Sequence, residues 1–190
     1  MAVNSFFSSD ELQEIGLKKF GQNVLISRKA SIYSPETITI GDHVRIDDFC
    51  ILSGTIHLGS FIHISAYTAL YARFGITVQD YVTISGRVMV YSQSDTYSGA
   101  YMTNPMVPSR FTHISGGPVI FEKHVIVAAG SIIFPNVTLH EGAAIGAMSL
   151  VNRDVEPWTV QVGIPIRLLK PRDKKILELE QQLMDSLRNP

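Results

Sequence analysis

The chain has 190 residues, of which 45% are hydrophobic, so it is long and apolar enough to bury a core and is not a disordered polypeptide. Its formal net charge is −1, which provides no overall positive field to attract nucleic acid or an anionic membrane. The one cysteine, Cys50, excludes an intrachain disulfide and a zinc site built from several cysteines.

The first residues, MAVNSFFSSDEL, lack the basic start and the long apolar run of a secretion signal. No stretch of the chain approaches the ~18 consecutive apolar residues of a membrane span, so we expect a soluble, cytoplasmic protein. Ser8 and Glu11 form a capping-box pattern ahead of Leu12 and Ile15, which predicts a short helix. We assign residues 1–23 to an N-terminal capping region.

An aliphatic or aromatic residue then recurs every six positions, with one two-residue slip and one long interruption. The recurring residues are Ile40, Ile46, Leu52, Leu58, Ile64, Leu70, Val78, Ile84, Val90, Phe121, Val127, Ile133, Leu139, Ile145 and Val151. A period of six fits neither an α-helix nor one long strand. It fits short strands joined by tight turns, three to a triangular coil of about eighteen residues. We therefore predict an all-β fold, a parallel β-helix over residues 24–170, because a β-sandwich has no reason to keep this phase.

The repeat stops over residues 91–118, where a long loop is predicted to leave the coil. The loop contains Tyr97, Tyr101 and Phe111, which makes it too apolar for a disordered segment. A loop of this length on a rigid scaffold is typical of a binding site. The alternative is that the loop packs against a neighbouring subunit, and both roles are compatible.

Residues 171–190 form the third region of the chain. Ile176, Leu179, Leu183 and Leu187 are spaced as on one face of a helix, which predicts a helix from 174 to 188. We expect this helix to cap the open end of the coil, with packing against another subunit as the alternative.

Three further segments carry a resemblance to a known family. They are Ala144-Ile145-Gly146-Ala147-Met148-Ser149-Leu150-Val151, Pro157-Trp158 and Gly163-Ile164-Pro165. Together with the hexads and the single long loop, they resemble the hexapeptide-repeat acyltransferases, in the branch of galactoside and maltose acetyltransferases and surface-polysaccharide amino-sugar acetyltransferases. The segments 94–99 and 102–105 are similar to the members that modify bacterial surface sugars.

The resemblance implies a left-handed coil, a homotrimer with active sites between subunits, and acetyl-CoA as acyl donor. It implies that backbone groups at Ala129 and Ala147 meet the pantetheine arm, with Asn152 and Arg153 further along the same path. Arg167 and Lys170 match basic residues near the nucleotide phosphates, which agrees with the preference of phosphates for fixed cations. The alternative for these two cations is that they belong to an ordinary solvated surface.

Acyl transfer requires a general base near the attacking atom. The galactoside enzymes supply a histidine from the loop, but residues 94–98 here contain none. Three candidates remain, namely His63, Asp95 and His113. Ser65, Arg73, Tyr97 and Asn104 are the candidate contacts to the acceptor. The other four histidines, His43, His57, His124 and His140, are expected at the surface.

The predicted function is therefore transfer of an acetyl group to the amino group of a nucleotide-linked (dTDP or UDP) amino-deoxy sugar for bacterial O-antigen or capsule synthesis. The alternatives are O-acetylation of a sugar hydroxyl and a non-catalytic β-helix scaffold. A zinc-dependent member of this fold would need a close pair of histidines, which the sequence does not contain. No metal requirement is therefore expected.

Overall fold

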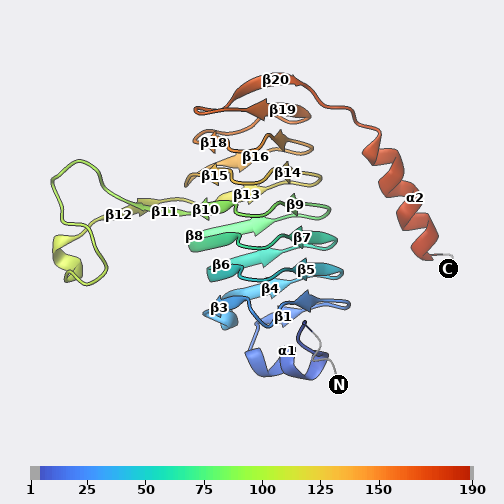
Figure 1. The fold of residues 1–190 in the computed structure, drawn as a ribbon, viewed down its shortest axis with the longest axis horizontal. Helices are drawn as coiled ribbons and strands as arrows, with labels where there is room; N and C mark the ends of the chain where they lie inside the picture. The colour runs from blue at the N-terminus through green and yellow to red at the C-terminus, as the bar shows by residue number, and fades with distance from the viewer. Residues whose placement is uncertain (1–4, 189–190) are drawn as a thin grey trace.

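The computed structural model describes residues 5–188 and is a parallel β-helix with one extruded loop (Figure 1). The strands stack coil upon coil, and every pairing within the coil is parallel until the last strand. A hairpin of β11 (Gln93–Asp95) and β12 (Ile114–Gly116) carries the loop away from the stack. The predicted fold class is confirmed.

Two hydrogen-bonded sheets supply the faces of the coil. The first contains β1 (Lys19–Phe20), β3 (Ser31–Tyr33), β4 (Ile38–Ile40), β6 (Ile51–Leu58), β8 (Ala69–Val78), β10 (Met89–Tyr91), β13 (Val119–Phe121), β15 (Ile132–Ile133), β16 (Thr138–Leu139) and β18 (Leu150–Val151). Its long strands β6 and β8 turn a corner, because one end of β8 pairs with β10 and the other with β13. This sheet therefore covers two faces of the triangular coil.

The remaining face, here called the third face, is the second sheet. Its strands are β2 (Leu25–Ile26), β5 (Val44–Ile46), β7 (Ile62–Ile64), β9 (Thr83–Ile84), β14 (Ile126–Val127), β17 (Ala144–Ile145), β19 (Thr159–Val162) and β20 (Arg167–Pro171). Short 3₁₀ turns at Pro35–Thr37 and Ser109–Phe111 complete the secondary structure together with the two helices.

The core is the column of apolar residues that the period of six predicts. All fifteen recurring residues, from Ile40 to Val151, are at most 4% exposed. The two-residue slip is a bulge in β8: Ala72 pairs with Gly54 and Ile76 pairs with Ile56, so three residues of β8 lie opposite one residue of β6. The bulge contains Arg73, which is exposed.

A column of stacked side chains runs along one corner of the coil. The ring centroids of His43 and Phe61 are 4.7 Å apart, those of Phe61 and Tyr81 5.1 Å, and those of Tyr81 and His124 5.2 Å. Trp158 follows His124 at 6.2 Å. Each of the five residues has a positive φ, so the same left-handed turn places its ring at this corner of its coil. Gly142, also with positive φ, occupies the corner on the coil between His124 and Trp158. His124 is only 6% exposed, so the expectation of a surface position is wrong for this histidine.

Helix α1 (Ser9–Ile15) closes the first end of the coil (Figure 1). The predicted capping box is present, since Ser8 Oγ accepts from the Glu11 backbone N–H and Glu11 accepts from the Ser8 N–H. Arg28 pairs with Glu11 through two bonds of 2.7 and 2.6 Å, and these bonds hold the Glu11 pKa at about 2. Leu12 is buried against the core.

Helix α2 (Ile176–Arg188) forms as predicted, but it does not cap the last coil. Figure 1 shows it beside the coil, and it contacts the stacked corner: Glu180 binds His124 Nε2 at 2.7 Å, and Tyr81 Oη lies 3.2 Å from Met184 Sδ. The last coil is instead covered by β20, which folds back antiparallel on β19. Arg172 lies between β20 and α2, and it ties this connecting segment to the coil by donating to the carbonyls of His124 and Gly142. No helix within residues 5–188 has the length and apolar character needed to cross a bilayer.

Neighbouring isoleucines on β15 give a matched test of the core column. Ile133 is fully buried and Ile132 is 37% exposed. We expect Ile133→Ala to lower the free energy of unfolding by about 2–5 kcal/mol, because it removes buried methyl groups and leaves a cavity. Ile132→Ala should lower it by no more than about 1 kcal/mol. Urea unfolding followed by circular dichroism measures both, and equal losses would contradict the assigned inward and outward positions.

Candidate active site

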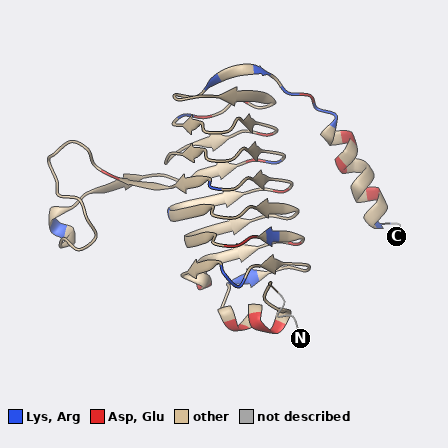
Figure 2. Ribbon diagram, in the orientation of Figure 1, with Lys and Arg blue, Asp and Glu red and all other residues tan. Residues whose placement is uncertain are grey.

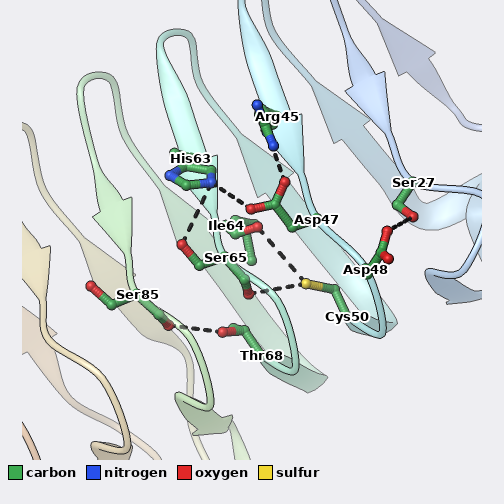
Figure 3. A network of polar contacts seen from close by, with 10 residues as sticks. All are labelled: Ser27, Arg45, Asp47, Asp48, Cys50, His63, Ile64, Ser65, Thr68 and Ser85. Carbon is green, nitrogen blue, oxygen red and sulfur yellow. Dashed lines mark hydrogen bonds and ion pairs between the residues drawn. The ribbon is translucent and has the colours of Figure 1, made fainter. Parts of the chain in front are cut away.

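A polar network lies on the third face, around His63 of β7 (Figure 3). Asp47 Oδ2 lies 2.8 Å from His63 Nε2, and Arg45 Nε donates to Asp47 Oδ1 at 2.7 Å. Ser65 Oγ is 3.5 Å from the same His63 nitrogen. The sequence candidates His63 and Ser65 are therefore brought together, with a carboxylate and a guanidinium that sequence reasoning did not identify.

The coil register explains why these residues meet. Arg45 of β5 pairs with His63 of β7, which pairs with Thr83 of β9. The residue after each strand follows the same rule, since the Asp47 N–H donates to Ile64 and the Ser65 N–H donates to Ile84. Because side chains alternate along a strand, the core residues point inward and these polar residues point outward.

The Asp47 carboxylate is ionised in the neutral pH range. Partial burial alone raises its pKa, but the hydrogen bonds and charges of Arg45 and His63 act in the opposite direction, and the resulting pKa is below the ordinary value. Asp47 thus adds stability at pH values above its unfolded pKa, and this contribution is lost as the pH falls through its folded pKa.

Cys50 lies beneath this network and is fully buried. Its Sγ lies 3.2 Å from the carbonyl oxygen of Ser65. Burial raises the pKa of this thiol to about 11. Because the nucleophile of a cysteine is its thiolate, Cys50 is a packing residue and not an acyl-accepting nucleophile.

We therefore expect the native chain to resist alkylation of Cys50 by iodoacetamide at pH 7.5, whereas the urea-unfolded chain should take up one label. Mass spectrometry of the intact protein measures the difference. Complete labelling of the native chain within minutes would show that the thiol is accessible and would contradict its structural role.

The extruded hairpin forms a second candidate region. A cleft of about 450 Å³ lies between the hairpin and the coil. Its lining comprises Tyr91, Gln93, Ser94, Asp95, Tyr97, Ile114, Ile132, Phe134 and Pro135. The candidates Asp95 and Tyr97 thus share one cleft, although Tyr97 is 96% exposed. Gln93 was not identified from the sequence, yet its Oε1 is buried without a hydrogen-bond partner among the described residues.

The other candidates, His113 and Asn104 of the loop and Arg73 of β8, lie outside this cleft lining. The His113 ring stacks on Tyr101 at 5.1 Å, and the Asn104 side chain accepts from the Met106 N–H within a turn. Arg73 projects from the β8 bulge. His63 and Asp95 lie on different sheets and make no contact with each other within residues 5–188, so one chain alone does not assemble them into a single site.

The residues predicted to meet the acyl donor lie toward the last coils. Ala129 and Ala147 are exposed and occupy equivalent positions of successive coils, since the Met148 N–H donates to the Ala129 carbonyl at 3.0 Å. Asn152 is exposed, and Arg153 Nη2 donates to the Ile166 carbonyl at 2.8 Å, which ties this turn to the final hairpin. Arg167 and Lys170 are exposed on β20, and Figure 2 shows the Lys and Arg positions of this strand in blue.

The described residues, 5–188, contain no cluster of three or more His, Cys, Asp or Glu side chains that could hold a metal ion. What the two regions offer is acid–base chemistry: an imidazole paired to an ionised carboxylate on the third face, and a carboxylate in an apolar cleft beside the hairpin.

Comparison with known proteins identifies the family. The chain is 49% identical over 179 residues to the dTDP-4-amino-4,6-dideoxy-D-glucose acyltransferase of Escherichia coli, covering 93% of both proteins. A crystal structure of AntD, an N-acyltransferase from Bacillus cereus, in complex with dTDP and 3-hydroxybutyryl-CoA is 49% identical, with a TM-score of 0.95 over 98% of this chain and 100% of that one. A variant of AntD was solved with dTDP-4-amino-4,6-dideoxyglucose and coenzyme A, at 50% identity and a TM-score of 0.94 over 97% of this chain and 100% of that one.

A more distant structure agrees on the fold. A maltose O-acetyltransferase from Clostridium difficile 630 is 22% identical, with a TM-score of 0.55 over 87% of this chain and 74% of that chain. A search of protein-family models found no match. The coil and the two similar proteins, the Escherichia coli acyltransferase and AntD, together lead to one conclusion: the chain belongs to the hexapeptide-repeat acyltransferases with a left-handed parallel β-helix, and is itself an acyl-CoA-dependent acyltransferase.

Proposed function

We propose that this enzyme transfers an acyl group from acyl-CoA to the amino group of a dTDP-linked 4-amino-4,6-dideoxy sugar. The observation that carries the proposal is the 49% identity to an acyltransferase of that name over 93% of both chains. The complexes of AntD with dTDP, its amino sugar and CoA derivatives support the same substrate class. The proposed role is modification of a precursor for a bacterial surface polysaccharide, O-antigen or capsule, in the cytoplasm.

We further propose that the enzyme works as a homotrimer. The loop projects from the coil (Figure 1), and its residues Tyr97 and Met106 are 96% and 88% exposed. A neighbouring subunit that covers this loop would remove apolar surface from water. Such an assembly would also allow Asp95 of one subunit to approach the third face of the next, which a single chain does not achieve.

The proposed donor site uses the last coils. The small side chains of Ala129 and Ala147 leave the backbone accessible to the pantetheine arm, and Asn152 and Arg153 follow along the same path. Arg167 and Lys170 on β20 supply positive charge for the nucleotide phosphates.

In the proposed reaction the acceptor amine attacks the thioester carbonyl. A C–N bond forms, the C–S bond breaks, CoA leaves as its thiolate, and the amine loses a proton to a base. We propose His63 and Asp95 as the groups that receive or direct this proton, with Ser65, Arg73, Tyr97 and Asn104 as acceptor contacts. His113 is the third candidate base. Its ring stacks on Tyr101, and among residues 5–188 it has no carboxylate partner of the kind that His63 has in Asp47.

A thiol-release assay tests the substrate class. We expect turnover with dTDP-4-amino-4,6-dideoxyglucose and either acetyl-CoA or 3-hydroxybutyryl-CoA, and no turnover when the amino group is replaced by hydroxyl. The preferred acyl group is read from kcat/KM. Activity on free hydroxy-sugars alone would contradict amine transfer, and no CoA-dependent thermal shift would favour a non-catalytic scaffold.

Single substitutions test the two bases. His63→Ala and Asp95→Ala are each expected to lower kcat by at least ~10²-fold, the lower end for loss of general-base assistance. His57→Ala is the matched control, because His57 is an exposed histidine on β6 that bonds Thr39. Wild-type rates for both His63→Ala and Asp95→Ala would remove this assignment and favour proton transfer by the acceptor itself.

A further inference from the structure

We propose that Asp47, held by Arg45, is a positioning residue that keeps the His63 proton on Nε2 and so presents Nδ1 as the proton-accepting atom. This inference rests on the proposed function, because it assigns the acid–base behaviour of the histidine that the proposed reaction uses. Asp47 and Arg45 touch neither substrate in the proposal and act only through His63.

The geometry of the carboxylate supports this role. Each Asp47 oxygen has one partner in the network: Oδ1 accepts from Arg45 Nε at 2.7 Å, and Oδ2 lies 2.8 Å from His63 Nε2. The Asp47 side chain is 19% exposed, whereas those of Arg45 and His63 are 54% and 42% exposed. The carboxylate is thus the most enclosed member, fixed on both sides, and the imidazole reaches outward from it (Figure 3).

The protonation state follows from the bonding rules of the groups. An ionised carboxylate only accepts hydrogen bonds, so the nitrogen facing it must carry a proton. The neutral imidazole then has its lone pair on Nδ1. Within the described residues this nitrogen makes no hydrogen bond, since the contacts of His63 to Asp47 and Ser65 both involve Nε2.

Within residues 5–188 of one chain, the groups that face His63 include no charge other than those of Arg45 and Asp47. On β5 and the turn after it, the facing groups are Arg45 and Asp47. On β9 the paired residue is Thr83, which is uncharged. Directly after its own strand, β7, the neighbour is Ser65. The tautomer is therefore determined by Asp47.

This arrangement differs from a serine-nucleophile relay. In such a relay the carboxylate and the serine bind opposite nitrogens of the imidazole, but here both lie at Nε2 and the Ser65 contact is the longer one. Ser65 is therefore not activated as a nucleophile. The acceptor amine passes its proton to Nδ1, the resulting imidazolium is stabilised by Asp47, and it returns the proton to solvent or to the departing CoA thiolate.

The test compares Asp47→Asn with Asp48→Asn in the full-length enzyme. Asp48 is the adjacent carboxylate and binds Ser27 and Lys29 instead of His63, so its substitution is a matched control. Long-range ¹H–¹⁵N spectra of histidine-labelled protein report the tautomer directly, and His63→Ala identifies the His63 signals by their loss. We expect an Nε2–H tautomer in wild type and in Asp48→Asn, and a shift toward Nδ1–H in Asp47→Asn.

The kinetic arm uses the dTDP-amino sugar with acyl-CoA. Asp47→Asn should lower kcat on the order of 10²-fold while leaving KM for acyl-CoA within about twofold, because the donor site lies on other coils. An unchanged tautomer in Asp47→Asn would overturn the proposal, as would a changed tautomer with wild-type kcat. An inactive His63→Ala beside a fully active Asp47→Asn would overturn only this inference, whereas full activity of His63→Ala would overturn the proposed base as well.

Discussion

The inward apolar side chain of each hexad determines where every other residue of the coil lies. Removing these side chains from water is the main favourable term in folding, and the column from Ile40 to Val151 is continuous and nearly completely buried. Because each strand bonds the strand above and below it in parallel register, a residue's position within its hexad fixes its face and its neighbours. Side chains at the outward positions can therefore take part in binding or catalysis without disturbing the core.

The same repetition that builds the core builds the candidate site. Residues one coil apart, such as Arg45 and His63, are paired by the sheet, so a charged network can form between segments that are not adjacent in sequence. The corner column of Tyr81, His124 and Trp158 shows the same principle with rings. There, repetition creates a surface that receives helix α2 through Glu180 and Met184.

Most of the coil could be predicted from the sequence. Each hexad buries one apolar side chain, so the same signal recurs every six residues. The capping box at Ser8 and Glu11 was predictable for a similar reason, since its two hydrogen bonds are local. The position of α2 was not, because its stripe of leucines indicates an apolar face but not what that face contacts. Leu177, Leu179, Leu183 and Leu187 in fact stay 38–51% exposed, and polar contacts to the corner hold the helix.

The candidate network on the third face was predictable in part. The sequence named His63 and Ser65 as candidates, and the eighteen-residue coil could have indicated Arg45 as the neighbour of His63 and so led to Asp47. Gln93 and the apolar lining of the loop cleft could not have been found this way, because the loop interrupts the repeat that supplies the register.

The central claim is that the outward residues of the third face receive the acceptor of an acyl-CoA-dependent transfer. The most direct measurement is a crystal structure of the enzyme with coenzyme A and dTDP-4-amino-4,6-dideoxyglucose. The account predicts that the sugar nitrogen lies within hydrogen-bond reach of His63 Nδ1 or of an Asp95 carboxylate oxygen, with the CoA thiol on the same side of that nitrogen. A sugar nitrogen bound away from both residues, with coenzyme A still along the last coils, would contradict it.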